Sequence, residues 1–205
     1  MPQKKKKRAA ARKPIVPETL TEFRLPARPR ISPDGKRIVY IEKTVSKPGK
    51  YETRLWMLDT SGGEPRAFTH GPKDSSPCWS PEGDRVAFIR TPEGEASQIY
   101  VIDAAGGEAR KLTSFPRGSI GEFRFSPAGG KLAVAFRETA EERTEEARKK
   151  REEEGRSTPP WVIDDPWFRL DGDGYFGAAR YKLYLVDLET GEHSLLYDRD
   201  KLGGF

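Results

Sequence analysis

Cysteine and histidine are scarce in this chain of 205 residues. Its single cysteine, Cys78, excludes an internal disulfide framework and any zinc site built from several cysteines. The two histidines, His70 and His193, are too few for a histidine-rich metal centre. We therefore expect no metal ion and no cofactor.

Long apolar runs are also missing. No stretch approaches the roughly 18 consecutive apolar residues of a membrane helix. The basic N-terminus is not followed by the apolar segment of about 7–15 residues that marks a signal peptide. Apolar residues make up 35% of the chain, which permits a core but not a large one. The sequence predicts a cytoplasmic protein without a membrane partner.

Positive charge is concentrated at the N-terminus. Residues 1–13 contain seven basic residues and no acidic one, whereas residues 14–205 contain 30 basic and 32 acidic residues. A run such as Lys4 to Arg8 can act as a localisation signal or as an arm that binds nucleic acid, because clustered cations release counterions from phosphates. The simpler interpretation, which we favour, is a basic disordered tail over residues 1–18 that is solvated and binds no nucleic acid.

Three similar units follow one another along the chain. Each begins with a Ser-Pro step and a glycine and continues into an apolar run, and the copies cover residues 32–41, 80–89 and 126–136. Their serines are 48 and 46 residues apart. Each unit has a later apolar run that ends in an aspartate: Asp59, Asp103 and Asp187. Proline and glycine suit a tight turn between two strands, and the later aspartate suits the turn out of a third strand.

Units of about 40–50 residues with four short antiparallel strands are typical of a β-propeller. The sequence therefore predicts an all-β fold of three four-stranded blades, over about residues 19–70, 71–115 and 116–200, in a partial propeller at 19–205. The apolar second strands should be covered on both faces. Three residues before the Ser-Pro steps should face the core between blades: Ile31, Trp79 and Phe125.

The sequence predicts three blades, whereas a closed propeller has about four to eight blades. A three-blade arc exposes an apolar face at each end. We therefore expect either the front portion of a longer product or arcs of several chains assembled into a ring. The end at residues 201–205, just after the last predicted strand of the third blade, favours the first alternative.

The third blade carries an insertion at about residues 138–178. Its first part, residues 139–156, is dominated by charged residues and predicts a short exposed helix with a capping box and a glycine stop. The residues expected to support this helix are Thr139 with Glu142 in the capping box, the pairs Glu145–Lys149 and Glu146–Lys150, and Gly155 at the end. The second part, residues 159–176, combines aromatic and acidic residues, a mixture that suits a recognition surface.

The repeats resemble those of two groups of propellers. Ser-Pro-Asp-Gly turns followed by strands like Leu-Tyr-Val-Asp occur in TolB-like propellers and in the propeller of the prolyl oligopeptidase family of serine peptidases. The segment Asp171-Gly172-Asp173-Gly174-Tyr175-Phe176, followed by residues 181–191, is most similar to the acylaminoacyl-peptidase-like branch of that family. The resemblance covers about residues 19–205 and implies the first three blades of a seven-bladed propeller.

The family resemblance also implies where catalysis takes place. Its members hydrolyse peptides with a Ser-Asp-His triad on a C-terminal α/β-hydrolase domain, whose serine lies in a Gly-x-Ser-x-Gly turn. No such turn occurs here, because Gly-Ser-Ile-Gly at 118–121 is one residue too short, and we expect Ser119 to be a loop serine. His70, after a fourth strand, and His193, at the start of another, should be structural or exposed. We predict no catalytic residue in this chain, which would be inactive by itself.

Two further candidates have plain structural interpretations. Asp171-Gly172-Asp173-Gly174 resembles the start of a calcium-binding loop. Tyr175 and Phe176 stand where that loop needs Asp or Asn and then glycine, so we expect an ordinary turn. Cys78, beside Trp79 in a strand, is expected to be a buried packing residue.

The resemblance favours one function and leaves alternatives. The chain would be the N-terminal propeller portion of a prolyl oligopeptidase family serine peptidase, gating peptide access to a hydrolase domain that is absent from this chain. Alternatively, it is a stand-alone TolB-like scaffold that binds a protein partner through its propeller face and the aromatic insertion. A tether to nucleic acid through residues 1–13 is a third hypothesis, from another class.

Overall fold

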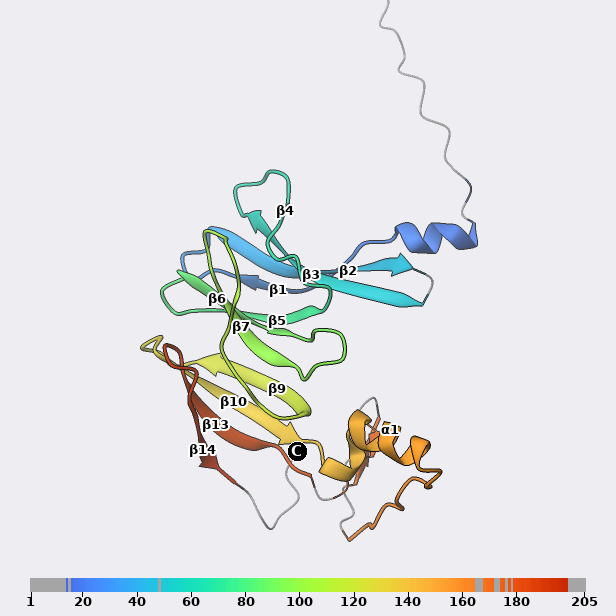
Figure 1. Ribbon diagram of the computed structural model, residues 1–205. Helices are drawn as coiled ribbons and strands as arrows, with labels where there is room; N and C mark the ends of the chain where they lie inside the picture. The colour runs from blue at the N-terminus through green and yellow to red at the C-terminus, as the bar shows by residue number, and fades with distance from the viewer. Residues whose placement is uncertain are drawn as a thin grey trace, which may run out of the picture.

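Three four-stranded antiparallel sheets follow one another along the chain (Figure 1). The structure is a computed structural model that describes residues 14, 16–47, 49–164, 168–171, 174–175, 177 and 179–198. The first sheet consists of β1 (Leu25–Ile31), β2 (Arg37–Lys47), β3 (Lys50–Asp59) and β4 (Arg66–Ala67). The second consists of β5 (Asp74–Trp79), β6 (Arg85–Arg90), β7 (Gln98–Asp103) and β8 (Arg110–Lys111). The third consists of β9 (Gly118–Phe125), β10 (Lys131–Glu138), β13 (Lys182–Asp187) and β14 (His193–Tyr197).

The sheets stack with their first strands next to one another. β5 contacts β1 of the preceding sheet and β9 of the following one. We call this side of the stack, formed by β1, β5 and β9, the inner edge. Within each sheet the strands lie in chain order from the inner edge outward. This arrangement is that of successive propeller blades, and the predicted all-β class is confirmed.

The Ser-Pro turns join the first and second strands of each sheet, as predicted. In the first sheet, the backbone N–H of Gly35 donates to the Ser32 carbonyl at 2.9 Å. The Ser32 hydroxyl accepts from the backbone N–H of Arg37, also at 2.9 Å. The glycines of the three turns, Gly35, Gly83 and Gly129, have φ of 71°, 71° and 73°, the left-handed region that glycine adopts without strain.

Two apolar cores lie between the sheets. One joins the first and second sheets and includes Leu55 and Phe88. The other joins the second and third sheets and includes Ile99 and Leu132. Residues 86–89 of β6 are all buried, whereas buried and more exposed residues alternate in β2 and β10. The prediction of cover on both faces is therefore right for β6 and wrong for β2 and β10, because only the middle one of the three described sheets has a neighbouring sheet on each side.

The residues before the Ser-Pro turns follow the same rule. Trp79 is 8% exposed in the core between the first and second sheets, and Phe125 packs against the core between the second and third. Ile31 is 61% exposed, so the prediction that it faces a core is wrong. The position of Ile31 in the repeat directs its side chain toward the sheet that would precede its own. Ile31 lies on the first sheet, and the described residues form no sheet before that one. Leu183, on the third sheet, is 41% exposed, and apolar residues are thus uncovered at both ends of the arc, as predicted.

Hydrogen bonds also join neighbouring sheets. Their donors are side chains and their acceptors are backbone carbonyls: Trp79 to Arg30 at 2.9 Å, Arg37 to Gly83 at 3.0 Å and Arg110 to Leu188 at 2.6 Å. These bonds fix the first sheet on the second and the second on the third.

The insertion of the third sheet contains η2 (Glu141–Arg143), α1 (Glu145–Glu153) and a hairpin of β11 (Arg169–Leu170) with β12 (Gly174–Tyr175). Figure 1 shows α1 beside the third sheet. No residue of α1 is buried, as expected of an exposed helix.

The start of α1 differs from the prediction. Its N-cap is Thr144, whose hydroxyl accepts from the backbone N–H of Ala147 at 3.2 Å. The predicted capping box of Thr139 and Glu142 is wrong, because the segment before Thr144 forms η2 instead.

The ion pairs of α1 confirm one prediction and correct another. Glu145 pairs with Lys149 at 3.3 Å, as predicted. Glu146 pairs with Arg117, just before β9, so the predicted pair of Glu146 with Lys150 is wrong. Gly155, with φ of 65°, follows the helix end as predicted.

Most of the predicted basic tail, residues 1–13 and 15, lies outside the described residues. η1 (Pro17–Glu22) begins with the last two residues assigned to that tail, so helical structure starts before the predicted boundary at residue 18. No helix in the described ranges is long and apolar enough to span a membrane.

Candidate functional site

A cavity of about 760 Å³ opens at the inner edge beside the third sheet. We call it the inner pocket. Its lining comes from all three sheets and includes Arg28 on β1, Ser76 on β5, Glu122 and Arg124 on β9, Ala135 on β10, and Tyr181 before β13. A cavity of this size accepts a small molecule or a short stretch of peptide.

β-Bulges direct the first strands toward the inner pocket. The pairing of β1 with β2 shifts around Arg28, and that of β5 with β6 shifts around Ser76. These two residues have φ of 50° and 52°, a left-handed conformation that non-glycine residues rarely adopt. The pairing of β9 with β10 also shifts beside the pocket. Such strained positions persist where the surrounding structure fixes them, and they cluster at functional sites.

Our sequence prediction did not identify the inner pocket, although a signal for two of the bulges is present. Pro29 and Pro77 directly follow the two left-handed residues, and each stands three positions before the serine of a Ser-Pro turn. Proline has no N–H to donate to a neighbouring strand, so it is accommodated at a bulge or a sheet edge.

Positive charge exceeds negative charge at the inner pocket. Arg28 and Arg124 line it together with one acid, Glu122, whose carboxylate lies 3.7 Å from the Arg124 guanidinium. The Arg124 side chain is 61% exposed and the Glu122 side chain is 85% exposed, so water weakens the attraction between their charges. Arg30, two residues after Arg28 on β1, does not line the pocket, but its charge acts on the neighbouring Cys78 thiol together with that of Arg124.

Cys78 lies on β5, between the arginines of β1 and β9. Burial raises the pKa of its thiol, and the smaller effects of a backbone hydrogen bond at Phe125 and of the charges of Arg124 and Arg30 lower that pKa. The thiol is half-buried and packs against the core between the second and third sheets. The predicted packing role is therefore confirmed, although burial is only partial. A thiol with a raised pKa is a poor nucleophile at neutral pH.

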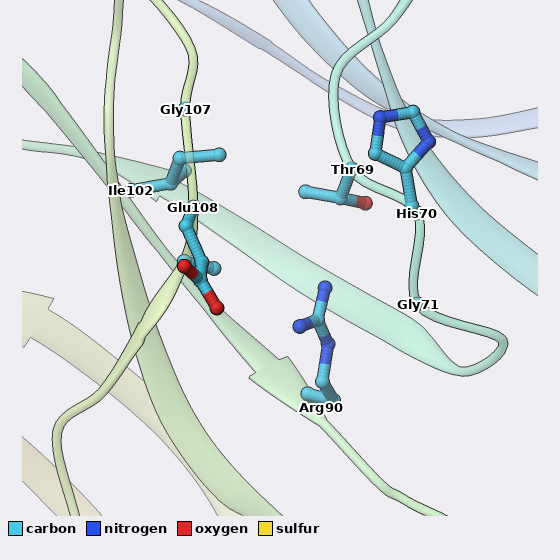
Figure 2. A pocket seen from close by; sticks show the side chains of 8 residues that line it. Thr69, His70, Gly71, Arg90, Ile102, Gly107 and Glu108 are labelled. Atoms are coloured by element: carbon cyan, nitrogen blue, oxygen red, sulfur yellow. The ribbon is translucent and has the colours of Figure 1, made fainter.

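A second pocket of about 260 Å³ lies between the segment after β4 and the turn from β7 to β8. Figure 2 shows the side chains of His70, Arg90 and Glu108 around its hollow. Fully buried Asp74 holds Arg90 through two contacts, Nε to Oδ1 at 2.7 Å and Nη2 to Oδ2 at 2.9 Å. These hydrogen bonds to Asp74 raise the pKa of Arg90. A Cβ on Gly71 would stand 2.5 Å from Arg90 Nε, so the pair requires glycine there. The guanidinium is thus already neutralised.

The structure separates the residues considered for catalysis. Ser119 lies within β9 opposite Arg137, so the prediction of a loop serine is wrong, because its segment forms the first strand of the third sheet. His70 is exposed in the segment after β4, and His193 is exposed at the start of β14 with its ring 4.6 Å from that of Phe115. Both histidines therefore match the expectation of structural or exposed positions.

The calcium-like motif falls at the β11–β12 hairpin. Asp171 is in a turn after β11, whereas Gly172, Asp173 and Phe176 lie outside the described residues. Among the residues that the structure describes, no group of three or more His, Cys, Asp or Glu side chains could hold a metal ion.

Aromatic residues of the insertion stack on one another. Arg143 lies over the Trp161 ring at 3.8 Å, Trp161 stacks on Tyr175 at 5.6 Å, and Tyr175 stacks on Phe168 at 5.9 Å. Trp161 is 37% exposed and Tyr175 is 45% exposed. Trp167 lies outside the described residues. The recognition role of this segment stays a prediction.

Comparison with known proteins relates the chain to two groups of propellers. No protein-family model matches it. The uncharacterised peptidase YuxL of Bacillus subtilis strain 168 is 33% identical over 183 residues, which is 88% of this chain and 27% of YuxL. The Tol-Pal system protein TolB of Francisella tularensis is 38% identical over 63 residues, which is 31% of this chain and 14% of TolB.

Solved structures give the same result for the fold. Pyrococcus horikoshii acylaminoacyl peptidase matches with a TM-score of 0.66 and 20% identity over 86% of this chain and 25% of that protein. The β-propeller domain of the trilobed protease from Pyrococcus furiosus matches with a TM-score of 0.54 and 18% identity over 84% of this chain and 42% of that domain's chain.

The chain spans about a quarter of the length of YuxL and of the Pyrococcus horikoshii acylaminoacyl peptidase. Its repeats, its stacked sheets and these similarities agree with one another. The chain is therefore a β-propeller portion that is related in sequence to the peptidase YuxL, is similar in fold to the acylaminoacyl peptidase and trilobed protease propellers, and is also similar to TolB.

Proposed function

We propose that this chain controls which peptides reach the hydrolase domain of a serine peptidase. The observation that carries the proposal is the inner pocket, which gathers side chains from the first strands of all three sheets in a chain related to the peptidase YuxL. The catalytic serine, aspartate and histidine would belong to a hydrolase domain outside these 205 residues.

A rigid arc of sheets can select peptides by size. Side chains of β1, β5 and β9 line the edge that a peptide would pass. Hydrogen bonds between sheets, such as that from Trp79 to the Arg30 carbonyl, resist widening of this edge. An extended peptide meets few clashes there, whereas a folded chain meets many. The arc would thus keep folded proteins away from the catalytic serine.

Peptide hydrolysis by the whole gene product that contains this chain tests the proposal. The assay compares kcat/KM for a dipeptide substrate with kcat/KM for an unstructured peptide of about 20 residues. Ala135→Trp places a large ring in the inner pocket and narrows it. Ala105→Trp, at an exposed position in the turn after β7, is the matched control.

We expect Ala135→Trp to lower the ratio of long-peptide to dipeptide hydrolysis by about tenfold, because a steric clash acts on the larger substrate. Ala105→Trp should leave the ratio unchanged. Equal effects of Ala135→Trp on both substrates would contradict gating. A gene product that hydrolyses neither peptide and forms a folded assembly would favour the TolB-like scaffold that binds a protein partner.

A further inference from the structure

We propose that the inner pocket binds a carboxylate of the incoming peptide, supplied either by an Asp or Glu side chain or by a free C-terminus. This inference rests on the proposed function, because it names the class of peptide that the inner edge favours. It concerns binding to this chain and needs no catalytic group.

Guanidinium groups from two sheets approach the same part of the inner edge. Arg28 and Arg124 line the pocket from β1 and β9. The charges of Arg30 and Arg124 both act on the Cys78 thiol, which lies on the strand between them. Glu122 lines the same pocket and pairs only loosely with Arg124, at 3.7 Å. The local excess of positive charge therefore favours an anionic partner.

The arginines retain free donors for such a partner. Arg30 Nη1 donates to the Pro29 carbonyl at 3.2 Å, and Arg124 Nη1 donates to the Phe123 carbonyl at 3.0 Å. Each bond uses one nitrogen of a guanidinium and holds the side chain against its own strand. The remaining N–H groups form a planar fork that can bind a carboxylate through two parallel hydrogen bonds.

The backbone holds this arrangement in place. Arg28 and Ser76 occupy the left-handed positions of two bulges, which turn their side chains away from the regular alternation of a strand. Ser76 adds a hydroxyl, and Tyr181 and Ala135 add an aromatic ring and a methyl group to the lining. The pocket thus combines cationic and hydroxyl donors with an apolar wall, as a peptide-binding site requires.

Arg90, at the second pocket, does not offer such a site. Arg90 is bound through two of its nitrogens to the buried Asp74 carboxylate, which supplies the compensating charge. Glu108 lines the same small pocket and adds negative charge. This contrast places the carboxylate site at the inner edge.

Fluorescence anisotropy with the 205-residue protein tests the inference. Three labelled hexapeptides differ only in their carboxylates: one has a central Glu and an amidated end, one has a central Gln and an amidated end, and one has a central Gln and a free C-terminus. The test variant is the double variant Arg28→Gln and Arg124→Gln. Arg156→Gln, which removes a 72% exposed arginine on the insertion, is the charge-matched control for the single variant Arg124→Gln. Arg124→Lys keeps the charge but removes the fork.

We expect the Glu peptide, the free C-terminal peptide or both to bind about fivefold more tightly than the neutral peptide at about 0.05 M salt, because each exposed ion pair contributes modestly. The peptide that gains affinity identifies the source of the carboxylate. About 0.5 M salt should abolish the difference. The double variant should abolish it as well, Arg124→Lys should reduce it, and Arg156→Gln should leave it unchanged.

Equal binding of all three peptides by the wild-type protein would overturn the inference, and so would a difference that persists in the double variant. If the double variant does not fold, Arg124→Gln alone decides, since this side chain is exposed. A gene product that lacks size selection would refute the gate and leave the binding result intact. Equal binding of charged and neutral peptides would refute only the carboxylate site.

Discussion

Substitution of Trp79 by alanine should destabilise the chain severely. Trp79 is 8% exposed in the core between the first and second sheets. Its indole N–H donates to the Arg30 carbonyl at 2.9 Å, and the Arg37 guanidinium lies 5.1 Å from the ring centroid. Trp79→Ala therefore removes packing, a hydrogen bond and a cation–π contact together.

The magnitude follows from burial. Replacing a buried tryptophan by alanine costs about 3–5 kcal/mol in the free energy of unfolding. Ile31 occupies the same position in the first unit of the repeat but is 61% exposed. Ile31→Ala should therefore change that free energy by no more than about 0.5 kcal/mol. Trp79→Phe, which keeps a ring and loses the N–H donor, should cost about 1 kcal/mol through the hydrogen bond and a little more through the smaller ring.

Urea unfolding of the 205-residue protein, followed by far-ultraviolet circular dichroism, measures these differences. With a slope of about 2 kcal/mol/M, a loss of about 4 kcal/mol lowers the midpoint by about 2 M. Where Trp79→Ala leaves no folded baseline, Trp79→Phe supplies the measurable step. Similar midpoints for Trp79→Ala and Ile31→Ala would refute the reasoning. In a longer product whose further blades cover the first sheet, Ile31→Ala should become costly.

Three further outcomes are expected. Gly191→Ala should cost about 2 kcal/mol or more, because φ is 74° there and a Cβ would collide with the Leu112 carbonyl; a urea midpoint equal to that of the wild type would contradict this. Backbone hydrogen bonds from Thr190 and Glu189 lower the pKa of Asp187, so its contribution to stability is complete above the ordinary aspartate pKa and is lost as the pH falls through the lowered value. Asp187→Asn should therefore show a smaller drop in urea midpoint than the wild type between about pH 6 and about pH 3, and an equal drop would argue against this role. Cys78, half-buried and with a raised pKa, should react with Ellman's reagent about tenfold or more slowly in the folded protein than in urea, and equal rates would exclude that environment.

Local patterns in the sequence predict the strands and their turns well. The Ser-Pro step and its glycine define the hairpin between the first two strands, since the turn has a position with positive φ that Gly35 occupies without strain, whatever packs around it. The aspartates that end β3, β7 and β13 are equally local signals. Repetition of these signals predicts sheets that stack on one another.

Features that depend on neighbouring sheets or on competing local contacts are harder to predict. Ile31 and Trp79 share one position in the repeat, but only Trp79 has a sheet in front of it. Glu146 turns away from its own helix because Arg117 of the body lies within reach. The inner pocket combines residues more than 90 positions apart, such as Arg28 and Arg124, and no local pattern joins them.

The coding sequence beyond the codon for Phe205 tests most directly whether these blades belong to a peptidase. We expect an in-frame continuation with further Ser-Pro-Asp/Glu-Gly units, followed by a Gly-x-Ser-x-Gly turn that supplies the nucleophile. A stop codon directly after Phe205, together with a folded assembly of the 205-residue product, would contradict the gating function and favour a stand-alone scaffold.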